Sequence, residues 1–86
     1  MDEMQQHNEC TTRFIELANE MKDKEIDIRV ISASLMAASG IYATYMAAGN
    51  AGALEPTGVD KVVSAYRQTL EHIQNRKKEE IQSGGA

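Results

Sequence analysis

The stretch IRVISASLMAASGIYATYMAA, residues 28–48, decides the fold of this 86-residue chain. After Arg29 it contains no charged residue, and it is filled with small side chains at Ala33, Ser34, Ala37, Ala38, Gly40, Ala43 and Ala47. A helix that is apolar or small on every side is normally a buried one. The stretch therefore predicts a central, alanine-rich helix, with Asp27 capping its start and Gly49-Asn50 ending it.

An amphipathic pattern precedes this stretch, over about residues 8–22. Its apolar positions recur at helical spacing, and they are Cys10, Phe14, Leu17, Ala18 and Met21. The polar side chains occupy the other face, so the pattern predicts a helix with one buried stripe. Asn8 is the candidate N-cap.

A loop and a third helical pattern follow the central stretch. Residues 49–58 (GNAGALEPTG) hold three of the six glycines and the only proline, which is typical of a loop. Thr57 and Asp60 form a weak capping box, and a helix is predicted from about Gly58 to Glu80. Its apolar stripe consists of Val59, Val62, Val63, Tyr66, Leu70 and Ile73.

These patterns predict an all-α fold, a small three-helix antiparallel bundle with a central Ala-rich helix. The chain is expected to form a single helical domain, 1–86, with helices at about 8–22, 28–48 and 58–80 and flexible ends at 1–7 and 82–86. The alternative is one long helix over 8–48 plus a C-terminal helix, packed as a dimer. It arises because heptad spacing continues through residues 22–27, interrupted only by Lys24. The charge cluster at 22–27 favours a break.

Composition and charge exclude several classes of protein. A net charge of -4 gives no basic footprint for nucleic acid, and the short basic run Arg76-Lys77-Lys78 is followed at once by two glutamates. A single cysteine allows no internal disulfide, and residues 1–9 lack the basic start and apolar run of a signal peptide. A cytoplasmic location is therefore predicted.

The uncharged stretch is long enough to span a bilayer. Of the nineteen residues 30–48, however, six are strongly apolar and six are alanine, while the other seven are Ser, Gly, Thr or Tyr. Large apolar residues contribute about -0.3 to -0.6 kcal/mol each to insertion, so their favourable sum is only a few kcal/mol. A buried helix is thus favoured, and a membrane-associated protein using residues 30–48 stays an alternative.

Two segments carry a resemblance to known proteins. FIELANE (residues 14–20) followed by VISASLMAA (residues 30–38) resembles a small family of uncharacterised, all-helical bacterial proteins of unknown function. The likeness extends over about residues 14–75. It implies a bacterial, cytoplasmic, all-helical protein, and it supplies no assigned activity.

Residues with reactive or metal-binding side chains are few and scattered. His7 and Cys10 lie one helical turn apart, with His72 or Glu3 as a possible third ligand, but structural zinc normally takes four ligands. Cys10 is expected to be a small buried residue. The serines of the central stretch have no base on their own helix. No catalytic motif, metal site or cofactor is therefore predicted.

The central helix predicts an interface. Two neighbouring helices cover most of its circumference, and the remaining uncharged strip consists of Ser32, Met36, Ser39, Ala43 and Met46. A homodimer is the commonest assembly for such a surface. The sequence thus favours a non-enzymatic cytoplasmic helical module for self-association or protein interaction. The alternative to it is a small ligand-binding protein or enzyme whose site forms at a dimer seam from Tyr42, Tyr45, His72 and Glu16.

Overall fold

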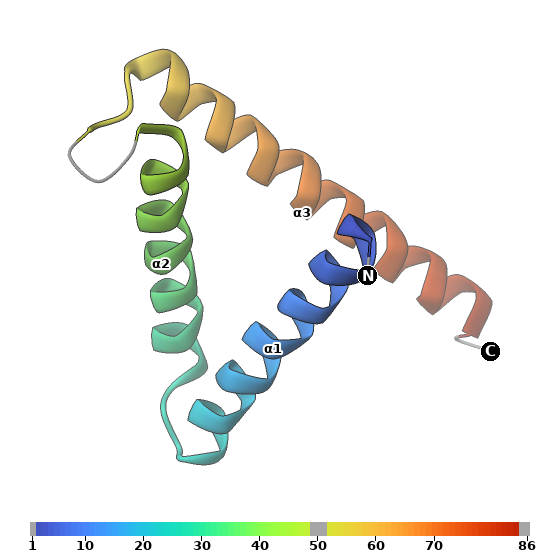
Figure 1. Cartoon of the computed structure of the whole chain (residues 1–86). Helices are drawn as coiled ribbons and strands as arrows, with labels where there is room; N and C mark the ends of the chain where they lie inside the picture. The colour runs from blue at the N-terminus through green and yellow to red at the C-terminus, as the bar shows by residue number, and fades with distance from the viewer. Residues whose placement is uncertain (1, 49–51, 85–86) are drawn as a thin grey trace. The chain divides into compact units, whose positions relative to one another are not determined.

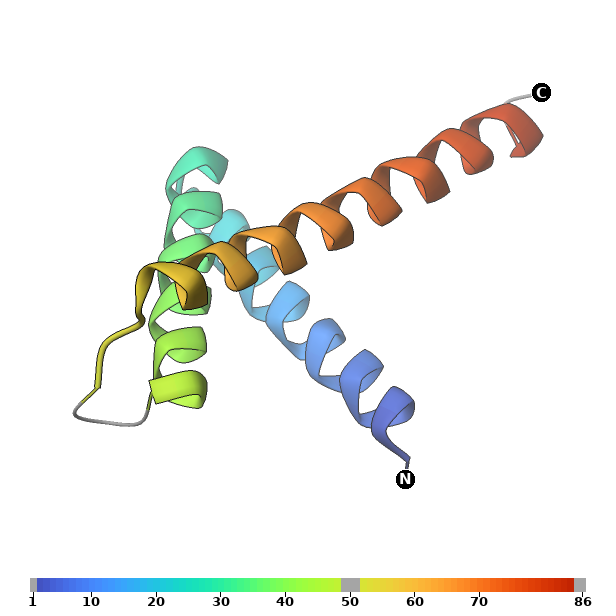
Figure 2. The same ribbon diagram turned by 90° about the horizontal axis from the view of Figure 1, so that it is seen from above.

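The computed structural model describes residues 2–48 and 52–84. Within these residues it contains three α-helices and no strand, namely α1 (Glu3–Asp23), α2 (Ile28–Ala48) and α3 (Pro56–Gly84) (Figures 1 and 2). This confirms the predicted all-α, three-helix fold. The antiparallel arrangement of the helices stays a prediction.

The chain divides into two compact units, Met1–Ile41 and Tyr42–Ala86. The first holds α1 and the first two thirds of α2, and the second holds the end of α2 and all of α3. The boundary falls inside α2, which is nevertheless one uninterrupted helix. The expectation of a single domain over 1–86 stays a prediction.

Helix α1 begins five residues before the predicted start. Asp2, not Asn8, is its N-cap: the Gln5 backbone N–H donates to the Asp2 carboxylate (2.8 Å), and the Asp2 N–H donates to the Gln5 side chain (3.0 Å). This reciprocal pair is a capping box, which satisfies two of the unpaired N–H groups at a helix start. Residues 3–7, predicted to be a flexible end, are therefore helical, and Asn8 lies inside α1.

The break between α1 and α2 is made by backbone hydrogen bonds. The Ile26 N–H donates to the Met21 carbonyl (3.1 Å), and the Glu25 N–H donates to the Lys22 carbonyl (2.9 Å). This is the Schellman arrangement, and it places Glu25 at a φ of 67°, in the left-handed region. The single long helix over 8–48 is therefore wrong, and the predicted break is confirmed.

Helix α3 begins at Pro56, two residues before the predicted start. The Val59 N–H donates to the Glu55 carbonyl (3.0 Å), so Pro56 is the first helical residue, where its missing N–H costs nothing. Thr57 consequently lies within the first turn, and the capping box predicted from Thr57 and Asp60 is wrong. The predicted helix end at Gly49-Asn50 lies outside the described residues.

Helix α3 also continues past its predicted end at Glu80. It includes residues 82–84, which were predicted to be flexible, whereas residues 85–86 are outside the described part of the chain. Lys77 and Glu80 form an ion pair (3.5 Å) one turn apart, and the Ser83 hydroxyl donates to the Glu79 carbonyl (2.8 Å). An i,i+3 ion pair of this kind supports an exposed helix by a few tenths of a kcal/mol.

Burial in both units concentrates near the connections between helices. In the first unit Ile31 is the only buried side chain among the described residues (8% exposed), with Ala18 and Met21 half-buried. In the second unit the half-buried positions are Ala43, Thr44, Ala48, Leu54, Gly58 and Val62. The predicted stripe of α1 is thus partly covered at its C-terminal end, while Phe14 and Leu17 are exposed.

Candidate interaction surface

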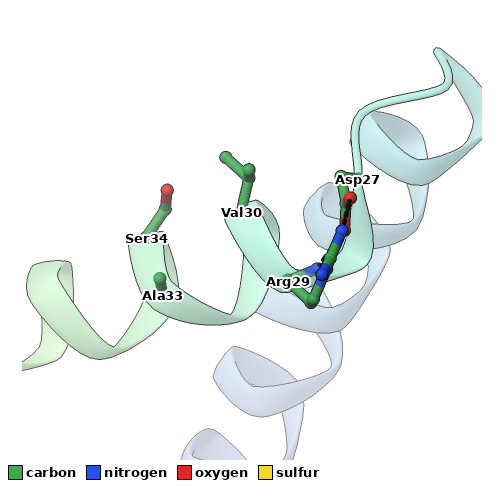
Figure 3. Close-up of a pocket in the computed structure, with 5 residues that line it drawn as sticks. All are labelled: Asp27, Arg29, Val30, Ala33 and Ser34. Atoms are coloured by element: carbon green, nitrogen blue, oxygen red, sulfur yellow. Dashed lines mark hydrogen bonds and ion pairs between the residues drawn. The ribbon is translucent and has the colours of Figure 1, made fainter.

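The first turns of α2 carry a shallow, open hollow lined by Asp27, Arg29, Val30, Ala33 and Ser34 (Figure 3). The two charged side chains that line it, Asp27 and Arg29, form an ion pair with each other. The Asp27 carboxylate accepts hydrogen bonds from the Arg29 backbone N–H (2.8 Å) and from the guanidinium (2.9 Å to Nη2). Asp27 is therefore the N-cap of α2, as its sequence position predicts.

The ion pair shifts the titration of both partners. Hydrogen bonds from the Arg29 side chain and then its backbone lower the pKa of Asp27, and the same carboxylate raises the pKa of Arg29. Both side chains are solvent-exposed and paired with each other. The hollow is therefore an open surface at the start of a helix, and it presents no enclosed site.

At the opposite end of α2 two tyrosines form an exposed aromatic pair. The rings of Tyr42 and Tyr45 are stacked with centroids 5.9 Å apart and an interplanar angle of 26°. Tyr42 is 73% exposed, so the stack has an open face. Offset stacked rings attract each other beyond the effect of area burial, and the pair follows from the i,i+3 spacing on one helix.

Helix α3 presents its own apolar face. A second shallow hollow runs along it, lined by Val63, Tyr66, Arg67, Leu70, Glu71 and Gln74. The apolar members are the predicted stripe, yet Val63 and Tyr66 are more than half exposed. The stripe is therefore present as predicted, and its charged flanks separate it from the rest of the helix surface.

The uncharged strip predicted on α2 is open to solvent for most of its length. Met36 (62%) and Met46 (75%) are largely exposed, Ser32 and Ser39 are exposed as well, and Ala43 is half-buried. All five residues lie on α2, where helical periodicity places them on one face. Their role as an interface stays a prediction.

The candidate reactive residues are not assembled into a centre. Within the described ranges no three His, Cys, Asp or Glu side chains gather in a way that could hold a metal ion. Cys10 is exposed, so the expectation of a buried thiol is wrong. Of the four residues predicted for a site at a dimer seam, Tyr42 and Tyr45 are in contact, while Glu16 and His72 belong to different units.

Comparison with known proteins places the chain in a family. A model for proteins of unknown function, DUF3144, matches residues 8–83. The chain belongs to this family. The match confirms the resemblance predicted from residues 14–20 and 30–38, and the DUF3144 family carries no assigned activity. No curated protein and no solved structure matches the chain.

One further property of α2 concerns membranes. By length and composition alone, Ile28–Ala48 is the one described helix able to cross a bilayer, with a mean hydropathy of 1.3 over its most apolar window. Only 6% of that window is buried. The core helix of a water-soluble protein and a signal sequence near the N-terminus pass the same test, so one such helix is weak evidence for a membrane span.

Proposed function

We propose that this DUF3144 protein is a non-enzymatic helical interaction module that completes its hydrophobic core by binding another macromolecule. The observation that carries the proposal is the exposure of its apolar side chains. Among the described residues nineteen large hydrophobic side chains are at least 40% exposed, and only Ile31 is buried. Stable monomers rarely expose contiguous apolar surface beyond a few hundred Å².

The distribution of these side chains supports interaction over catalysis. They occur on all three helices, including Phe14 on α1, Met46 on α2 and Leu70 on α3. Catalytic sites instead combine a concave pocket with titratable groups whose pKa values are perturbed. The shifted pKa values of Asp27 and Arg29 instead belong to two exposed side chains that pair with each other at a helix start.

The test is the mass and stability of the purified chain without detergent. We expect an assembly heavier than the 9.5 kDa chain, with a thermal midpoint that rises with protein concentration. Light scattering after size exclusion gives the mass, and circular dichroism gives the midpoint. A 9.5 kDa species that unfolds cooperatively at a concentration-independent midpoint would overturn the proposal, because such a chain covers its own core.

A second candidate function is membrane association through α2, favoured by its length and hydropathy. At 1.5 Å per residue its 21 residues span about 31 Å, close to the hydrocarbon thickness of a bilayer. Flotation of the chain with phosphatidylcholine vesicles tests this candidate. Co-flotation that resists alkaline carbonate supports it, and recovery of all the protein in the bottom fraction argues against it.

A further inference from the structure

We infer that the connection between α1 and α2 is a conformational switch: residues 24–27 have a second, helical state that joins the two helices into one. The structure shows the connection formed, so the joined helix is the minor state of the free chain. The inference goes beyond the proposed function, since it concerns the conformation of the chain and needs no partner. The residues that carry it all belong to the unit Met1–Ile41.

No residue type at the connection opposes a continuous helix. Residues 1–39 contain neither glycine nor proline, the two residues that weaken or break helices most. In the connection, by contrast, Glu25 has a φ of 67°, in the left-handed region that is unfavourable for a residue with a Cβ. The joined helix returns Glu25 to the right-handed region and removes this cost.

The charged residues around the connection are also spaced for a continuous helix. Glu20 and Lys24 lie four residues apart, as do Glu25 and Arg29. In both pairs the acidic residue comes first, which is the favourable order on a helix. The second pair belongs to the joined helix only, because in the structure Glu25 lies outside both helices and Arg29 pairs with Asp27 (2.9 Å).

Three interactions make the connection the major state. The Asp27 carboxylate caps α2 by accepting from the Arg29 backbone N–H (2.8 Å). The Ile26 N–H donates to the Met21 carbonyl at the end of α1 (3.1 Å). Ile31 is 8% exposed, and a single straight helix does not supply enough neighbours to cover a side chain to this degree. Joining the helices therefore loses the cap and uncovers Ile31.

The joined helix presents a different apolar surface. The heptad spacing of α1 continues in phase into α2, through Met21, Ile28, Ile31 and Leu35. In one helix these side chains lie along one face, and Ile31, which is buried in the structure, becomes part of it. A molecule that binds this face of the joined helix shifts the chain toward that state. The switch thus links the exposure of a buried side chain to binding.

The experiment measures the distance across the connection by double electron–electron resonance. In a Cys10→Ser background, Thr12→Cys and Ala37→Cys place nitroxide labels at exposed positions of α1 and α2, 25 residues apart (37 − 12). The joined helix separates these positions by about 38 Å, at 1.5 Å per residue. The connection gives a shorter distance, because the chain turns back there (Figure 1). An excess of unlabelled chain removes distances between different molecules.

Two substitutions shift the two populations in opposite directions. Asp27→Ala removes the cap of α2, so we expect the population near 38 Å to rise about fivefold. Adding Glu25→Gly reverses this rise, because glycine adopts a φ of 67° freely and weakens the joined helix. Asp2→Ala is the matched control: it removes the cap of α1, away from the connection, and leaves both populations unchanged. A short distance alone in every variant overturns the inference.

A second pair of variants decides the case if Asp27→Ala fails to fold. Lys24 is the one charged residue within the heptad spacing, so Lys24→Leu completes the apolar face of the joined helix and raises the population near 38 Å about twofold. Lys22→Leu, off that face, is its control. Equal populations in the two variants overturn the inference. The mass of the assembly does not enter either test, so the failure of the switch and the failure of the proposed function are observed separately.

Discussion

The two connections between helices are formed in different ways. Between α1 and α2 only residues 24–27 are non-helical, none of them glycine or proline, and backbone hydrogen bonds end α1. The described part of the second connection, residues 52–55, precedes Pro56 and includes Gly52, with Leu54 packed against Gly58. The first connection thus depends on hydrogen-bond geometry and the second on residues with special backbone properties.

The largest effect is expected next to the first connection, at Ile31. This side chain is 8% exposed, so Ile31→Ala removes buried methyl groups and leaves a cavity, which lowers the free energy of unfolding by about 2–3 kcal/mol. Ile41→Ala, on the same helix at 72% exposed, is the control and costs less than about 0.5 kcal/mol. Urea denaturation measures both. Equal losses would show that the side of α2 carrying Ile41 is also covered in solution.

The second connection is tested by two glycines with opposite expected signs. A Cβ at Gly52 would overlap the carbonyl oxygen of Ala48, so Gly52→Ala lowers the free energy of unfolding by about 1–3 kcal/mol. A Cβ at Gly40, inside α2, meets nothing within 4 Å, so Gly40→Ala raises it by about 0.5–1 kcal/mol through helix propensity. Chemical denaturation of the pair checks both signs. A neutral Gly52→Ala would mean that the close approach to Ala48 does not shape the connection.

Glu25 tests the hydrogen-bonded end of α1. A residue with a Cβ at a φ of 67° is held in an unfavourable conformation that glycine adopts freely. We therefore expect Glu25→Gly to raise the free energy of unfolding by about 0.5–1 kcal/mol. Lys22→Gly, three residues earlier inside α1, should lower it by a similar amount. The same sign for both variants in thermal denaturation would contradict the Schellman geometry at this connection.

This contrast explains which parts of the fold the sequence predicts. The start of α2 follows from Asp27, a strong capping residue placed directly before the apolar stretch, and it agrees with the structure. The start of α1 is missed because residues 3–9 have no apolar periodicity, although Asp2 and Gln5 have capping-box spacing. The end of α3 is missed because Ser83-Gly84 is typical of a helix stop, yet both residues stay helical.

The candidate surface is predictable to a similar degree. Periodicity assigns Met36 and Met46 to one face, and the i,i+3 spacing of Tyr42 and Tyr45 anticipates their stack. Periodicity does not say whether a face is covered, which is why Cys10 is exposed on a stripe that was expected to be buried. The Arg29 contact to Asp27 depends on the side chain folding back over two residues, and no spacing rule predicts that rotamer.

The smallest expected effect concerns the charge of Asp27 at the first connection. Its carboxylate has a pKa below the ordinary value of 3.8, because the Arg29 side chain and backbone donate to the ionised form. A depressed pKa in the folded state means that this stabilisation is present above pH 3.8 and is lost as the pH falls through the folded-state value. Because asparagine also caps helices well, Asp27→Asn removes the charge and keeps the cap.

The measurement is the difference in free energy of unfolding between the parent chain and Asp27→Asn, taken from pH 6 down to pH 2.5. We expect the parent to be the more stable near pH 6 and the difference to shrink below pH 3.8, with a smaller difference at high salt because the ion pair is exposed. The other carboxylates are present in both chains, so their contribution to the free energy of unfolding cancels in this difference. A difference that does not change with pH would mean that the cap alone stabilises the start of α2. The ion pair with Arg29 would then have no effect on stability.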